Sequence, residues 1–190
     1  MQVRVGGSFV WPPPSLSNGE SGVEAKGEGK ATRVVFIAGG VGINPLVSIV
    51  SHLEQMARET SKLGLVVKFL YTTRDPGPHM NPSGILFLER LISVFDTLGN
   101  EGQFQLFLTS GQNGGEEVRS GRFVVGVKGI EIQRRRIHHT DLLDALGPME
   151  GRKGTICYIC GVPTMTDEFV EKAKKAKGMN EANVLSEKWW

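Results

Sequence analysis

The segment that most constrains the fold is the stretch of residues 34–45, which reads VVFIAGGVGINP. Its first four residues are apolar and form a short continuous run, which is typical of a strand covered on both faces of a parallel sheet. Gly39, Gly40 and Gly42 follow, and they allow a tight turn that brings the backbone close to a ligand. The segment therefore predicts a buried strand that ends in a glycine loop.

A helix is expected to begin directly after this loop. Asn44 is a good N-cap residue, and Pro45 suits the first helical position because its missing N–H would be unpaired there anyway. Backbone N–H groups at a helix start, together with the positive end of the helix dipole, form an anion site. The pyrophosphate of a dinucleotide is the usual occupant of such a site between a strand and a helix.

The loop differs from the common dinucleotide fingerprint G-x-G-x-x-G, because Pro45 stands where the third glycine is expected after Gly40 and Gly42. The second predicted strand, Leu65 to Tyr71, also lacks an acidic residue at its end. Both departures argue against an ordinary dehydrogenase. A glycine turn can also serve close packing alone, so a purely structural interpretation of the loop stays open.

Strand and helix patterns alternate after residue 33, which predicts a parallel sheet with crossover helices. The expected strands are 33–38, 65–71, 104–109, 155–160 and 182–186, and the expected helices are 45–60, 83–98, 140–146 and 163–177. Residues 111–136 are rich in glycine and charge and are hard to assign, although 122–127 could add a short strand. The predicted fold class is α/β: a doubly wound nucleotide-binding domain on a five-stranded parallel sheet.

A second glycine loop follows the fourth predicted strand. Cys160 and Gly161 come at its end, and Pro163 opens the next helix, which repeats the pattern of the first loop. In an open parallel sheet the ligand lies at the carboxyl ends of the strands, at the point where the strand order reverses. We therefore expect the two loops to lie together on either side of one crevice.

Composition excludes several classes of function. The net charge of +2 over 190 residues does not indicate nucleic-acid binding, and no apolar stretch is long enough to span a membrane. The run Arg134–Arg136 is interpreted as a solvated face, and His138 and His139 lack companions at metal-ligand spacing, so no metal site is predicted. Cys157 is expected to be a packed core residue, and two cysteines alone suit a reducing compartment.

Four segments carry a resemblance to a known family. They are AGGVGINP at 38–45, YTTR at 71–74, CGVPTM at 160–165 and EKWW at 187–190. In order and spacing they resemble the C-terminal nucleotide domain of the ferredoxin-NADP reductase superfamily, over residues 33–190. The resemblance implies hydride transfer between NAD(P)H and a bound FAD.

The resemblance also assigns roles to individual residues. Cys160 would lie beside the nicotinamide ring, and Glu187 and Trp189 would face the flavin, so these three are the predicted catalytic residues. The residues predicted to bind the nicotinamide dinucleotide are Gly39, Gly40, Val41, Gly42, Ile43, Asn44, Pro45, Thr72, Arg74, Gly161, Val162, Pro163 and Met165. NADH is favoured over NADPH, because Ser110–Gln112 after the third strand offer no cation to a 2′-phosphate.

The chain departs from the family at its N-terminal side, where the flavin motifs R-x-Y-[ST] and G-x-[CS]-S are missing. Residues 1–11 are interpreted as the remnant of a flavin-binding barrel, 12–32 as a flexible, disordered linker, and 33–190 as the NAD(P)-binding domain. FAD would then need a separate flavin-binding domain, and an electron acceptor protein is a further possible partner. Two alternatives stay open: a non-catalytic nucleotide-binding or interaction module, and an ordinary dehydrogenase. No targeting signal is visible, and a cytoplasmic or mitochondrial location is expected.

Overall fold

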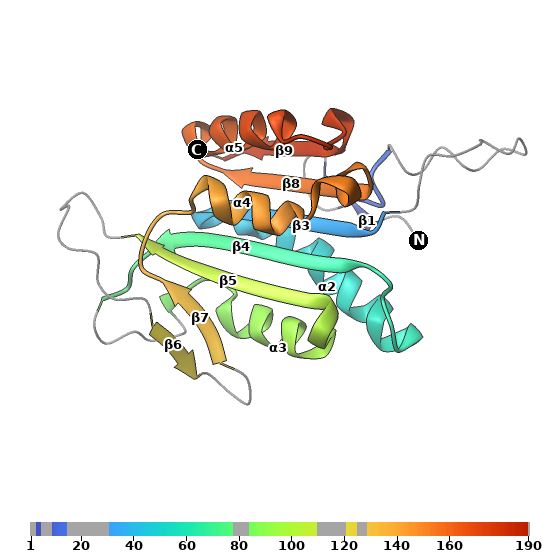
Figure 1. The fold of residues 1–190 in the computed structure, drawn as a ribbon. Coiled ribbons are helices and arrows are strands. Elements are labelled where there is room, and N and C mark those ends of the chain that lie inside the picture. Colours follow the sequence, from blue (N-terminus) through green and yellow to red (C-terminus); the bar gives the residue numbers. More distant parts are fainter. Residues whose placement is uncertain are drawn as a thin grey trace, which may run out of the picture.

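The protein is described here by a computed structural model, which covers residues 3–4, 9–14, 31–77, 84–109, 121–124 and 129–189 (Figure 1). Most of the predicted linker, the segment Ser110–Gln112 and Trp190 lie outside the described residues. The predictions made for these segments are therefore not tested by the structure.

A seven-stranded sheet with the order β6-β7-β5-β4-β3-β8-β9 forms the middle layer of the molecule (Figure 1). Its strands are β3 (Arg33–Gly39), β4 (Val66–Arg74), β5 (Gly102–Thr109), β6 (Gly121–Val124), β7 (Gly129–Gln133), β8 (Thr155–Gly161) and β9 (Val184–Lys188). All neighbouring strands are parallel except β6 and β7, which are antiparallel. The α/β class and the parallel sheet predicted from the sequence are confirmed.

The predicted number of five parallel strands was wrong, because β7 pairs with β5 as a sixth parallel strand. Its sequence, GIEIQ, offers only two β-branched residues inside a glycine-rich and charged stretch. A strand that short gives too weak a pattern to be recognised without its neighbours. The antiparallel β6 lies at Gly121–Val124, close to the short extra strand considered at 122–127.

Helices cover both faces of the sheet, as expected for a doubly wound domain (Figure 1). They are α2 (Ile43–Thr60), α3 (Leu88–Leu98), α4 (His139–Leu146) and α5 (Pro163–Lys175), with short 3₁₀ turns η1 (Gly40–Gly42), η3 (Gly99–Glu101), η4 (Met149–Gly154) and η5 (Glu181–Asn183). One core joins α2 and α3 to the sheet, and a second core on the other face joins α4 and α5. Apolar residues spaced three or four apart, such as Leu46, Ile49, Val50 and Leu53 in α2, provide the buried stripes.

The N-terminal segment contributes to the first of these cores. β1 (Val3–Arg4) pairs with β2 (Val10–Trp11) in a small antiparallel sheet, and Phe9 and Trp11 are buried in the main cluster. The Phe9 ring meets that of Tyr158 edge-on at 5.1 Å, and the Tyr158 hydroxyl donates to the Val10 carbonyl at 2.6 Å. Residues 9–11 therefore pack as part of the α/β fold, whatever precedes them.

Candidate functional site

The two glycine loops are in direct contact. β3 and β8 are neighbours, with Ala38 opposite Cys160, so the loops that follow them leave the sheet side by side. A Cβ atom placed on Gly42 would lie 2.6 Å from the Gly161 nitrogen, and one placed on Gly161 would lie 3.2 Å from the Gly39 Cα. Only glycine permits backbones this close. The structure therefore brings together the loops of the two predicted binding segments.

Two helices start at the two glycine loops without a side-chain cap. Among the described residues, neither α2 nor α5 has a side-chain hydrogen bond at its N-cap, and neither has an acidic residue in its first turn. α5 begins with Pro163 at its first position, as predicted. The positive ends of both helices thus lie at the two loops with no side-chain anion of their own, which suits a negatively charged ligand.

The predicted start of α2 was wrong by two residues. Gly42 is its N-cap, so Pro45 is the third helical residue, and the Asn44 amide donates to the Val41 carbonyl at 2.7 Å. The 3₁₀ turn η1 begins helical geometry before Asn44 is reached, so that side chain cannot act as the cap. Pro45 is tolerated because it still lies in the first turn, where its missing N–H removes no helical hydrogen bond.

Met165 and Thr72 lie next to the two loops. A Cβ on Gly39 would fall 2.7 Å from the Met165 sulfur, and a Cβ on Gly161 would fall 2.8 Å from the Met165 methyl carbon. The Met165 side chain is therefore packed against both glycines. Thr72 pairs with Gly39 in the register of β4 and β3, which places it at the same edge of the sheet.

The two cysteines of β8 face opposite sides of the sheet, with Cys160 in the core of α2 and α3 and Cys157 in the core of α4 and α5. Burial raises the pKa of each thiol to about 12, and for Cys160 the nearby Glu187 carboxylate adds to the effect. Burial therefore disfavours the thiolate form of both side chains at physiological pH. The prediction that Cys157 is a packed core residue is confirmed.

The predicted flavin-facing residues, Glu187 in β9 and Trp189 directly after it, lie beside the second loop. Glu187 is opposite Cys160 in the register of β9 and β8, and its carboxylate accepts a hydrogen bond from the Phe9 N–H at 3.0 Å. The Trp189 N–H donates to the Gly161 carbonyl at 3.0 Å. The Trp189 side chain is exposed, as are the loop residues Val41 and Val162. Solvent-exposed apolar side chains therefore lie in both loops and directly after β9.

Sequence reasoning missed an acidic residue at the end of the second strand. β4 continues past Tyr71 to Arg74, so the first residue after the strand is Asp75. The Asp75 N–H donates to the Thr109 carbonyl at 2.9 Å, which ties it to the end of β5. The predicted absence of an acidic residue at the end of this strand was therefore wrong, because Asp75 directly follows Arg74. Only the two threonines of TTRD are strand-forming residue types, so the local sequence does not show how far the strand continues.

The arginine run after β7 is only partly a solvated face. Arg134 forms an ion pair with Asp75, and Arg135 forms a two-point ion pair with Asp141 while its guanidinium lies 5.2 Å from the centre of the Phe107 ring. Arg136 and the predicted site residue Arg74 are exposed. The described part of the chain contains no group of side chains that could hold a metal ion, and no helix there is long and apolar enough to cross a membrane.

Curated proteins named Oxidoreductase NAD-binding domain-containing protein 1 match almost the whole sequence. The cattle protein is 28% identical over 193 residues, the human protein 27% over 194, and the zebrafish protein 27% over 194, each covering 99% of this chain. The chain is a homologue of these proteins. It spans about half of their length, at 52%, 51% and 59% respectively. No family model matches the sequence.

Solved structures share the fold. The ferredoxin-NADP⁺ reductase of Plasmodium falciparum aligns with a TM-score of 0.55 at 16% identity, covering 84% of this chain and 54% of that one. The flavohem-like FAD/NAD binding domain of nitric oxide dioxygenase from Vibrio cholerae O1 biovar El Tor aligns with a TM-score of 0.52 at 17% identity, covering 82% and 50%. The resemblance predicted from the four sequence segments is confirmed at the level of fold and relatives.

Proposed function

We propose that this domain binds NADH in the crevice between the two glycine loops and presents its nicotinamide ring to a flavin. The observation that carries the proposal is the contact between Gly42 and the Cys160–Gly161 backbone. This contact places the end of β3 against the end of β8. The strand order reverses between these two strands, and parallel α/β sheets bind dinucleotides at such a switch point. The name of the homologues, with its NAD-binding domain, supports the same ligand.

The first loop fits a pyrophosphate. Gly40 has a φ of +52°, and a Cβ placed on it would meet nothing within 4 Å, so the loop is open on that side. Gly39 to Pro45 would hold the phosphates through backbone N–H groups and the dipole of α2. Thr72 and the exposed Arg74, at the end of β4, would support the ribose and phosphates, since an arginine fork suits phosphate oxygens.

The second loop would position the nicotinamide ring. Gly161, Val162, Pro163 and Met165 would line it, and the neutral Cys160 thiol would lie at its side. When bound, the nicotinamide and flavin supply the hydride chemistry. The residues of this chain would fix the distance and orientation of the ring, and the exposed Val41, Val162 and Trp189 would exclude water once a flavin domain docks.

Partners and cofactors beyond the dinucleotide are part of the proposal. FAD would come from a flavin-binding domain, in keeping with homologues about twice as long as this chain. The roles of Glu187 and Trp189 toward the flavin, the electron acceptor protein and the cytoplasmic or mitochondrial location stay predictions. A nucleotide-binding module without turnover is the second candidate, because the FAD motifs of the superfamily are absent from this sequence.

Calorimetric titration of NADH into the folded chain tests binding, and reduction of an artificial acceptor in the presence of added FAD tests turnover. The variant Cys160→Ala should lower the hydride-transfer rate by about tenfold, with a smaller change in the NADH dissociation constant, because loosened packing misplaces the ring. Cys157→Ala is the matched control, since it removes the same buried atoms on the other face of β8. Equal rates for the two variants would remove Cys160 from the site, and NADH binding without turnover would favour the module.

A further inference from the structure

Asp75 occupies a position that the rest of the site leaves unexplained. It is the first residue after β4, and β4 is the neighbour of β3 on the side away from β8. Gly39 lies opposite Thr72 in the register of these strands, so Asp75 stands three residues beyond the start of the first glycine loop. At about 3.3 Å per residue this is roughly 10 Å further along the strand direction.

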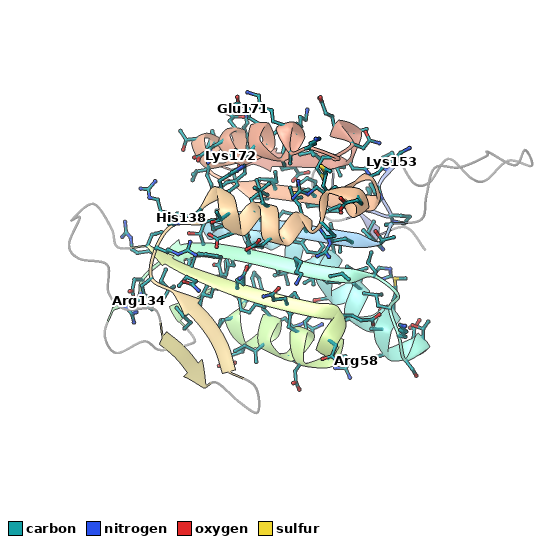
Figure 2. All side chains as sticks on the ribbon, viewed as in Figure 1. Arg58, Arg134, His138, Lys153, Glu171 and Lys172 are labelled. Atoms are coloured by element: carbon teal, nitrogen blue, oxygen red, sulfur yellow. The ribbon has the colours of Figure 1, made fainter. Side chains whose placement is uncertain are left out.

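The carboxylate of Asp75 is held from two sides. One oxygen accepts the Gly77 N–H at 2.9 Å, and the other forms the ion pair with Arg134, which follows β7. Figure 2 shows Arg134 at the same edge of the sheet as the carboxyl ends of β4 and β5. The two side chains are only 17% and 21% exposed, so the pair is fixed more firmly than a surface salt bridge.

A dinucleotide on the first loop has only two directions in which to extend along the sheet. The second loop and Cys160 lie on the β8 side, and the proposed function assigns that side to the nicotinamide. The adenosine half would therefore extend over the ends of β4 and β5, where Asp75 lies. A carboxylate at the end of the second strand is the group that accepts a hydrogen bond from the adenosine ribose in NAD-binding α/β domains.

Resting on the proposed function, we propose that Asp75 selects NADH over NADPH, and that Arg134 holds its carboxylate in place. A carboxylate has about four acceptor positions, and the two interactions above use about half of them, which leaves capacity for the ribose hydroxyl groups. A 2′-phosphate would instead place like charge against the Asp75 carboxylate, and such a contact is strongly unfavourable. Arg134 does not offset this repulsion, because its guanidinium is already paired with the Asp75 carboxylate.

The ion pair between Arg134 and Asp75 allows a prediction for variants that lack the Asp75 carboxylate. Asp75→Asn would weaken NADH binding by loss of the charged acceptor, and it would release Arg134 to face a 2′-phosphate. The double variant Asp75→Asn with Arg134→Met would lose that cation too. The affinity for NADPH should therefore rise in Asp75→Asn, and most of this rise should be lost when Arg134→Met is added.

The experiment measures the dissociation constants of NADH and NADPH by calorimetry on the full chain. The parent should prefer NADH, so its dissociation constant for NADPH should exceed that for NADH. Asp75→Asn should reduce this ratio, NADPH over NADH, by at least about tenfold, whereas Arg134→Met alone should keep the preference for NADH. Asp141→Asn is the matched control: it breaks the neighbouring Arg135 ion pair and should leave the ratio unchanged. Asp75→Ser, which can still accept the Gly77 N–H, should shift the ratio in the same direction if the asparagine variant does not fold.

The outcomes separate this inference from the proposed function. A parent chain that binds neither nucleotide contradicts the proposed function. A parent that binds NADH but shows the same ratio in Asp75→Asn, or a parent that prefers NADPH, overturns the role of Asp75 while leaving nucleotide binding intact. A shift of equal size in Asp141→Asn would also overturn it, because the effect would then be a general loss of order at this edge.

Discussion

Replacing Gly42 by alanine tests the contact on which the site depends. The added Cβ would lie 2.6 Å from both the Cys160 carbonyl carbon and the Gly161 nitrogen, whereas ordinary contact begins at 3.4 Å. The two loops would have to separate by roughly 0.8 Å, and the atoms in the way belong to backbone rather than to a flexible side chain. Overpacking of this kind costs about 1–3 kcal/mol, so we expect about 2 kcal/mol of lost stability.

Urea and thermal unfolding measure the first consequence, and a loss of 2 kcal/mol corresponds to a fall in Tm of about 4–8 °C for a domain of this size. Calorimetry measures the second, a fall in NADH affinity of at least about tenfold, because the separated loops no longer share one ligand. Gly151→Ala is the control, since a Cβ there meets nothing within 4 Å. A Gly42→Ala protein that is as stable as Gly151→Ala and binds NADH like the parent would refute the argument.

Two further predictions concern stability. Tyr158→Phe removes the buried hydroxyl that donates to the Val10 carbonyl and should cost about 1–2 kcal/mol in urea unfolding, and an unchanged midpoint would show that residues 9–11 are not held by this bond. Burial raises the pKa of Asp141, but hydrogen bonds from Arg135 and the His138 N–H outweigh it and hold the pKa below its ordinary value. The stability that this carboxylate contributes is present above about pH 4 and is lost as the pH falls through the lowered pKa of the folded state. The difference in urea midpoint between parent and Asp141→Asn should therefore shrink between about pH 4 and pH 2, and a constant difference would contradict the assignment.

The glycine loops were predictable because they depend on residue types that are adjacent in the sequence. A run of buried β-formers, then glycines, then a proline in the first helical turn leaves few alternatives for Gly39–Pro45, and the second loop repeats the pattern at Gly161 and Pro163. The α/β class and the parallel sheet followed from the alternation of strands and helices. These parts of the fold depend on residues that are neighbours in the sequence.

The features that were missed depend on distant partners. β4 extends to Arg74 because Thr72–Arg74 pair with Phe107–Thr109, and nothing in the local pattern fixes that length. Asp75 was overlooked for this reason, and its partner Arg134 comes from a strand that was not recognised. The start of α2 was misplaced because η1 adds a turn that cap preferences do not show.

The position of β3 has a consequence for how the chain folds. Val34 pairs with Val67 on one side and with Ile156 on the other, so the strand at the centre of the sheet acquires its second neighbour from a segment roughly 120 residues downstream. Closing so large a loop is costly in chain entropy and is slow compared with local contacts. The two glycine loops come into contact only once that late pairing is made, so a partly synthesised or partly refolded chain would present the first glycine loop without the second.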